Sequence, residues 1–160
     1  MDILFEQKLI QNTALAMELL HAVILEHYKK NKATTGLKFP LIFLVLPLLF
    51  QKRTTNVLYN KASPGSIYKA ISENREIPIG LQNRMEAYFE NTFDAISLGL
   101  SVKLFAIDYP VGEIVPIKKN LVCEDHSEDT KCMLAAAKRI GQTFSELTIE
   151  EIAQTLKVVF

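Results

Sequence analysis

Residues 39–50 read FPLIFLVLPLLF, a run of twelve apolar residues that includes the prolines Pro40 and Pro47. A membrane-spanning helix needs roughly 20 apolar residues, so this run is too short to cross a bilayer. A segment that is apolar on every side is typical of a buried short helix, and a buried strand is the alternative that periodicity does not exclude. We expect a short helix, begun or broken by its prolines, in the core or at an interface.

The segments on either side of this run have the spacing of amphipathic helices. Apolar residues return at three- and four-residue steps over residues 12–32, 63–73 and 80–100, which predicts a helix in each range. Asn12 is a suitable N-cap for the first helix. The first 101 residues are therefore expected to be helical.

The pattern changes after residue 101. Aliphatic runs at 102–107 and 113–117 flank the turn-forming residues 108–112, which predicts a β-hairpin. A helix is expected from about Glu128 to Gly141. Thr148 and Glu151 have the spacing of a capping box, which predicts the start of a last short helix.

These elements define the expected fold class as α+β and mostly α, with five or six helices and one hairpin. A chain of 160 residues suits a single domain, with a helical part over 1–101 and a hairpin plus helix pair over 102–160. The hairpin and the helix pair together suggest a winged-helix-like C-terminal part.

Composition excludes several classes of protein. The chain is 49% hydrophobic with a mean hydropathy of +0.13, which excludes a disordered chain. Two cysteines do not make a disulfide scaffold. The formal net charge is zero, so any contact with nucleic acid or anionic lipid must be local. The first residues lack the basic start of a signal peptide, and we expect a cytoplasmic protein.

One cluster has residue types that bind metals. Cys123, His126 and Cys132, with Asp125 or Glu128 as a fourth ligand, are an alternative zinc site, and the two cysteines are alternatively a regulatory disulfide. Structural zinc sites normally have four cysteine or histidine ligands with tighter paired spacing. We therefore expect ordinary thiols, with no metal and no cofactor.

The sequence offers little for catalysis. It contains neither of the common glycine-rich phosphate loops, and Ser97-Leu98-Gly99 lacks the leading glycine of a nucleophile elbow. His21 and His27 are six residues apart on one predicted helix, about 600° of rotation, so they face different directions. We expect no catalytic residues and no enzymatic activity.

Five motifs in a fixed order carry a family resemblance. They are Gln11–Ala14, Phe43–Phe50 followed by Arg53, Arg84 with Ser97–Gly99, Ala136–Phe144, and Glu150–Val158. Together they resemble the middle component of bacterial three-component ABC systems, the small accessory subunit of Lamassu-type anti-phage defence loci. Lys157 stands where the family pattern usually has a glycine.

The resemblance implies a non-catalytic subunit that assembles with an SMC/Rad50-like ABC ATPase and an effector, often a nuclease. In such systems the ATPase senses foreign DNA, and the accessory subunit helps to hold the effector to it. Contact with DNA is then indirect, through the complex, and no membrane is involved.

An adaptor of this kind should carry apolar surface for its partners, and two segments are candidates. The partner-interface candidates are Leu46, Pro47, Leu48, Leu49, Phe50, Arg53, Val158, Val159 and Phe160. The alternative for the first block is that its side chains belong to the core, and both roles are compatible.

Charge is unevenly distributed along the chain. Residues 1–80 hold ten basic and six acidic side chains, and residues 81–160 hold eight basic and twelve acidic ones. The candidates for contact with nucleic-acid phosphates are Lys29, Lys30, Lys32 and Lys52. The alternatives are a solvated helix end, or a charge asymmetry that orients docking.

Two other functions fit parts of the chain. A winged-helix DNA-binding regulator is suggested by the helix pair and the N-terminal lysines, although Glu150 and Glu151 open the last helix, where a DNA reader meets phosphates. A membrane-associated helper would use residues 39–50, which Lys38 and Lys52-Arg53 flank.

Overall fold

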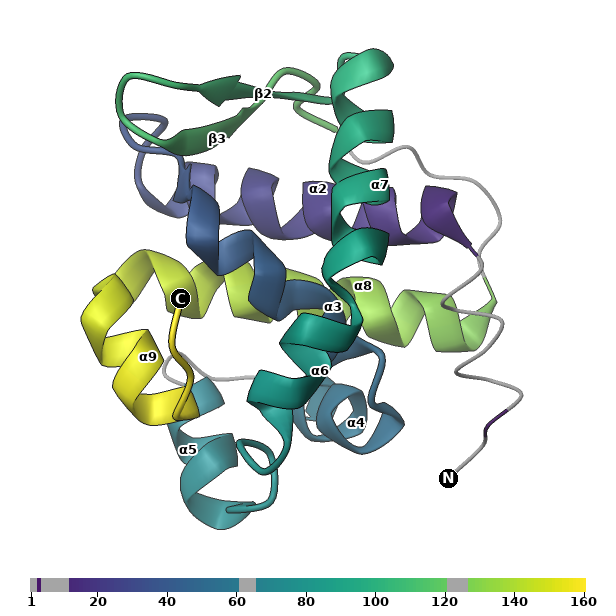
Figure 1. The fold of residues 1–160 in the computed structure, drawn as a ribbon, viewed down its shortest axis with the longest axis vertical. Helices are drawn as coiled ribbons and strands as arrows, with labels where there is room; N and C mark the ends of the chain where they lie inside the picture. The colour runs from purple at the N-terminus through teal and green to yellow at the C-terminus, as the bar shows by residue number, and fades with distance from the viewer. Residues whose placement is uncertain (1–2, 4–11, 61–65, 121–126) are drawn as a thin grey trace.

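The computed structural model describes residues 3, 12–60, 66–120 and 127–160. Over these residues the chain forms a group of packed helices with a small antiparallel sheet at one end, at the top of Figure 1. The helical elements are α2 (Thr13–Lys30), the 3-10 helix η1 (Phe39–Leu44), α3 (Val45–Leu49), α4 (Lys52–Asn60), α5 (Ser66–Glu73), α6 (Leu81–Ala87), α7 (Phe89–Ser101), α8 (Glu128–Glu146) and α9 (Ile149–Leu156). The strands are β1 (Leu37–Lys38), β2 (Phe105–Asp108) and β3 (Glu113–Pro116). The expected class, α+β and mostly α, is confirmed, while the described residues alone hold eight α-helices rather than five or six.

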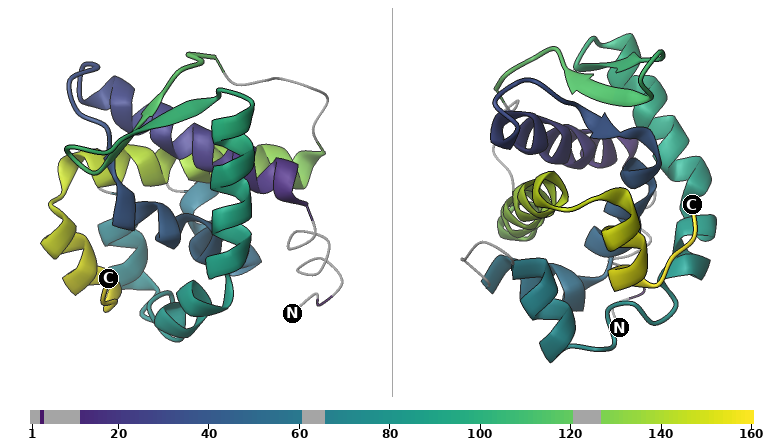
Figure 2. Two further views of the ribbon diagram at one scale, coloured as in Figure 1. Left: turned by 45° about the horizontal axis from the view of Figure 1, so that its top comes forward. Right: turned by 90° about the vertical axis from the view of Figure 1, so that its left-hand side faces the viewer.

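Helices α2 and α8 form the centre of the molecule. They lie side by side along most of their length, as Figure 2 shows, and α7 crosses the other side of α2. The predicted cap is confirmed, because the Asn12 side chain accepts a hydrogen bond of 2.9 Å from the Leu15 N–H. Gly141 of α8 allows the close approach: a Cβ built on it would lie 2.6 Å from the carbonyl oxygen of Val23.

The apolar run at 39–50 forms η1 and α3 and is mostly buried. The expectation of a short helix is confirmed, and the strand alternative is wrong. Pro40 is the second residue of η1 and Pro47 is the third residue of α3. Both therefore lie in the first turn of a helix, where a backbone N–H group would have no partner within the helix. Helix α3 packs among α2, α4, α6 and α8, which explains why the run has no polar face.

The predicted hairpin is confirmed, and it belongs to a larger sheet. Strands β2 and β3 pair antiparallel, with Phe105 opposite Pro116 and Asp108 opposite Glu113. Strand β1 adds to the other edge of β3, which gives the order β1-β3-β2. The sequence did not predict β1, because two residues are too short to show the alternation of a strand.

The long helix predicted over 80–100 is two helices, α6 and α7, which meet at Tyr88. The apolar spacing continues through the break, and no proline or glycine marks it. The Tyr88 ring packs edge-on against Phe50, with 5.6 Å between ring centroids. The break lets α6 lie against α3 while α7 crosses α2.

The C-terminal helix pair has the expected local structure but not a confirmed winged-helix arrangement. The capping box is confirmed: the Thr148 hydroxyl accepts from the Glu151 N–H at 3.2 Å, and the Glu151 carboxylate accepts from the Thr148 N–H at 2.9 Å. The hairpin, however, packs on α2 and α7 at the top of Figure 1, whereas α9 lies at the lower left.

Within the described ranges, no single helix is long and apolar enough to span a bilayer. The bent pair Phe39–Leu49 and Lys52–Asn60 reaches that length and apolarity only when taken together, with a turn of 101° at the break.

Candidate partner interface

The apolar block from Leu46 to Phe50 lies inside the molecule. The side chains of Leu46, Leu48, Leu49 and Phe50 are 0–2% exposed, and Pro47 is also buried. They pack against the chain's own helices, as the core alternative had it. A partner that binds the surface of the protein in this conformation therefore does not contact these side chains.

The other interface candidates lie at the surface, except one. Arg53 is exposed and forms an ion pair with Glu76. Val158 is 5% exposed, whereas Val159 and Phe160 are 78% and 45% exposed. Gln82 of α6 fixes this end of the chain, since its side chain accepts from the Val159 N–H at 2.8 Å and donates to the Val159 carbonyl at 3.3 Å. The backbone of Val159 is thus fixed by hydrogen bonds, while the side chains of Val159 and Phe160 are exposed to solvent.

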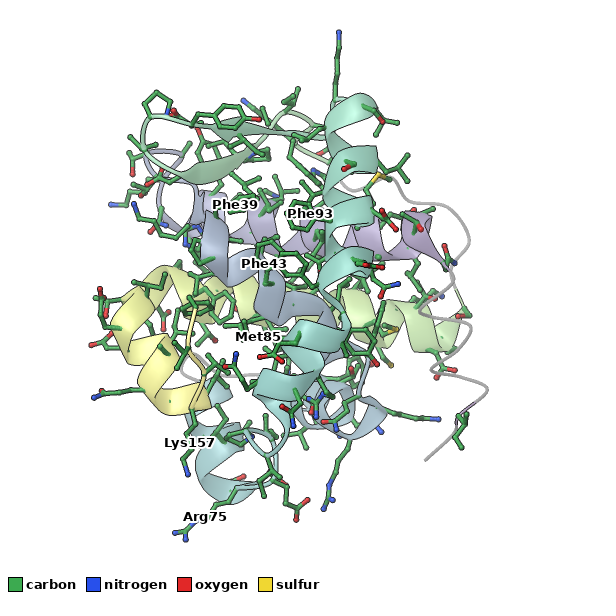
Figure 3. The ribbon with its side chains drawn as sticks, in the orientation of Figure 1. Phe39, Phe43, Arg75, Met85, Phe93 and Lys157 are labelled. Atoms are coloured by element: carbon green, nitrogen blue, oxygen red, sulfur yellow. The ribbon has the colours of Figure 1, made fainter. Side chains whose placement is uncertain are left out.

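A cluster of four phenylalanines lies next to this end of the chain, and three of them, Phe39, Phe43 and Phe93, are labelled in Figure 3. Phe39 and Phe43 come from η1, and Phe89 and Phe93 come from α7. The ring centroids are 5.5 Å apart for Phe39 and Phe43, 5.1 Å for Phe43 and Phe89, and 4.8 Å for Phe89 and Phe93. Phe89 and Phe93 are 48% and 42% exposed. We call these four side chains the aromatic face.

The aromatic face borders a hollow of about 320 Å³. Its apolar lining is Phe39, Pro40, Phe43, Met85, Phe89, Val159 and Phe160. The sequence predicted the two terminal residues as interface candidates but missed the four phenylalanines. A signal was present, because Phe39 and Phe43, like Phe89 and Phe93, have the four-residue spacing of one helix face.

Three carboxylates stand at the edge of this apolar surface. Glu86 lines the hollow, and Glu90 and Asp94 each follow an exposed phenylalanine by one residue, about 100° further round α7. All three are exposed, and no basic side chain of the described residues pairs with them. The aromatic face is therefore bordered by negative charge.

The four lysines proposed for phosphate contact are all exposed, but they do not form one patch. Lys29, Lys30 and Lys32 lie at the C-terminal end of α2, at the upper left of Figure 1. Lys52 begins α4, at the lower right of the same view. The structure thus separates Lys52 from the other three.

An ion pair between two strands of the sheet lies close to His27 of α2. Glu113 of β3 accepts from the Lys38 ammonium at 3.0 Å and from the Gly36 N–H at 3.0 Å. Burial raises the pKa of the Glu113 carboxyl, but these two hydrogen bonds outweigh it and leave the pKa below its usual value. His27 of α2 is buried nearby, and burial lowers the pKa of its imidazole to about 4. His27 is therefore neutral at pH 7.

His27 is expected to make the fold sensitive to acid. Its pKa is about 6.5 in the unfolded chain and about 4 in the folded one, so only the unfolded chain takes up this proton as the pH falls between those values. We expect the folded state to lose about 2 kcal/mol between pH 7 and pH 5 from this group. Thermal unfolding of the wild type and of His27→Gln over this range measures it. An equally steep pH dependence in the variant would assign the effect elsewhere.

The structure describes only part of the alternative zinc site. Among the residues that it describes, no three histidine, cysteine or acidic side chains come close enough to hold a metal ion, and Cys132 is a free thiol. Cys123, Asp125 and His126 lie outside the described residues. The His21 imidazole forms a hydrogen bond with the Lys118 carbonyl at 2.9 Å.

Residues 2–160 match the family model described as MC3, the ABC-three component (ABC-3C) system Middle Component 3. The chain belongs to this family. No curated protein and no solved structure matches it. Because the match covers almost the whole chain, the aromatic face lies within the MC3 unit.

Several motif residues of this MC3 chain have packing roles. The Arg84 guanidinium donates to the Pro47 carbonyl from Nε at 3.3 Å and from Nη2 at 3.0 Å, which joins α6 to α3. Gly99 faces the Phe105 ring so closely that a Cβ would overlap it. Lys157 has a φ of 55°, the left-handed conformation that favours glycine at the end of a helix. That conformation explains why a glycine is usual at the Lys157 position.

Proposed function

We propose that this MC3 chain is a non-catalytic accessory subunit that links an SMC/Rad50-like ABC ATPase to a nuclease-type effector. The complex would be a Lamassu-type bacterial anti-phage defence system in the cytoplasm. As a middle component, the chain belongs with the other components of a three-component system. The observation that carries the adaptor role is the aromatic face, with its exposed phenylalanines beside a hollow.

Exposed aromatic surface is the expected property of a subunit that works by contact. Aromatic side chains are enriched at protein interfaces, and the largest apolar patch of a monomer is often functional. Burial of apolar surface contributes roughly 25 cal/mol per Å², so a few hundred Å² would stabilise an assembly by several kcal/mol. Phe89, Phe93, Val159 and Phe160 supply such surface without any rearrangement of the core.

We assign the chemistry to the other components. The sequence has neither of the glycine-rich loops that commonly bind nucleotide phosphates. The four lysines proposed for phosphate contact are divided between two sides of the molecule, which supports contact with DNA through the complex rather than through this chain.

The proposal is tested by co-expression with the two proteins encoded beside this one. We expect the tagged chain to retain both the ATPase and the effector through affinity purification and size-exclusion chromatography. Omission of this chain should reduce the amount of effector that elutes with the ATPase. A monodisperse chain that retains neither protein would refute the proposal.

A further inference from the structure

We propose that the aromatic face and its hollow bind a basic amphipathic helix of a partner protein. The inference rests on the proposed function in one respect, that the helix belongs to another component of the system. It adds the chemistry of that partner: apolar side chains spaced for one helix face, with lysine or arginine along the margin.

The shape of the surface suits a helix. The hollow is lined by rings of η1 and by Phe89 of α7, by the buried Met85 of α6, and by the end of the chain at Val159 and Phe160. A hollow of about 320 Å³ is at the lower limit for a ligand pocket, which suits a few inserted side chains better than a whole small molecule. Helices bound in grooves insert such side chains at i, i+3 or i+4, and i+7.

The charge at the margin selects a basic partner. Glu86, Glu90 and Asp94 border the aromatic face, and the described residues give them no basic partner. Lys38, the residue before Phe39, is engaged by Glu113 at 3.0 Å. Lys157 points away from the labelled phenylalanines in Figure 3. The margin is thus locally negative on a chain of zero net charge. It would speed the approach of a cationic partner and fix the orientation in which that partner binds.

The same features disfavour the other occupants. An added β-strand needs free backbone groups, but Gln82 already takes both the N–H and the carbonyl of Val159. A second copy of the chain, docked face to face, would set these carboxylates against their own counterparts. An anionic membrane surface would be repelled in the same way.

The test uses the full chain and two labelled 18-residue helical peptides that share leucines at i, i+4, i+7 and i+11. One peptide carries lysines at the margin positions and the other carries glutamates. Fluorescence anisotropy should show at least tenfold tighter binding of the lysine peptide, with the difference reduced at high salt. Equal binding of the two peptides, or no binding of either, would overturn the inference.

Two double variants of equal net charge locate the effect. Glu90→Lys with Asp94→Lys should weaken binding of the lysine peptide at least fivefold. Asp108→Lys with Glu146→Lys changes the charge by the same amount on other exposed positions and should leave binding within twofold of the wild type. Equal weakening by both would mean that only the total charge matters, which would overturn the inference.

Assembly of the complex and peptide binding by the free chain distinguish failure of this inference from failure of the proposed function. If the ATPase–effector complex forms and tolerates Glu90→Lys with Asp94→Lys, the partner is not basic and the inference fails while the proposed function stands. If no complex forms, the proposed function fails and the peptide titration still decides the inference. A concentration-dependent dimer of the chain, or binding to anionic phosphatidylserine vesicles, that Phe89→Ser with Phe93→Ser abolishes would also overturn the inference.

Discussion

Valine in place of Gly141 is expected to lower the midpoint of thermal unfolding by roughly 10 °C. A Cβ on residue 141 would lie 2.6 Å from the Val23 carbonyl oxygen and 3.2 Å from the His27 backbone nitrogen, both on α2. Backbone atoms cannot rotate aside as a side chain does, so α2 and α8 must separate. Overpacking of this kind costs about 3 kcal/mol at the upper end of its usual range, and each kcal/mol corresponds to about 2–4 °C in a chain of this size.

The α2–α8 contact is the reason for the large effect, and matched variants isolate it. Gly141→Ala should cost less, because alanine gains up to about 1 kcal/mol of helix propensity over glycine. Lys138→Val introduces the same β-branched side chain at an exposed position of α8 and should change stability by less than about 1 kcal/mol. Thermal unfolding followed by circular dichroism measures all three. A Gly141→Val protein as stable as the wild type would show that the helices are not in close contact at this point.

Local signals predicted where two helices begin, although the helix expected to end at about Gly141 continues to Glu146. Asn12 and Thr148 both act as caps in the structure, because each provides a side-chain oxygen to backbone N–H groups a few residues ahead. The hairpin was equally clear, since a turn sequence separates two aliphatic runs. These features depend on neighbours in the sequence, which a single sequence displays directly.

Features that depend on distant residues were not predictable. Helix α7 separates from α6 at Tyr88, where the ring packs against Phe50, 38 positions earlier in the chain. Strand β1 exists because β3 offers it an edge. The sequence around residues 37–38 does not indicate the pairing with β3, and the sequence around Tyr88 does not indicate the contact with Phe50.

For the candidate site, the hardest feature to predict was which apolar side chains lie in the core and which lie at the surface. Leu46–Phe50 and the aromatic face are equally apolar in sequence, yet the first packs among four helices and the second faces solvent. Phe89 and Phe93 also have the spacing of an ordinary buried helix face, so the sequence alone did not decide whether they or Tyr88 and Thr92 face the core. Only the path of α7 across η1 brings the four rings together at the surface.

Serine in place of both Phe89 and Phe93 is expected to weaken the complex with the other ABC-3C components by more than 100-fold. Both rings are about half exposed; Phe89 stacks on Phe43, and Phe93 packs edge-on against Phe89, so they form a preorganised apolar contact for a partner. Truncation of a buried aromatic anchor at an interface costs about 2 kcal/mol or more. A combined loss of about 3 kcal/mol corresponds to more than 100-fold in the dissociation constant.

A loss of binding is informative only if the chain still folds. The exposed halves of the two rings contribute little to the core, and the broken ring pairs should cost about 0.5–1.5 kcal/mol each, which leaves a folded protein by circular dichroism. Tyr109→Ser with Val111→Ser removes comparable exposed apolar surface from the hairpin turn and should leave the affinity within threefold of the wild type. If the hairpin variant dissociates the complex while Phe89→Ser with Phe93→Ser retains it, the partner binds at the opposite end of α7 and the aromatic face is not its contact. If only the phenylalanine variant dissociates, the affinity resides in side chains that the fold holds at the surface and not in the larger apolar block that it buries.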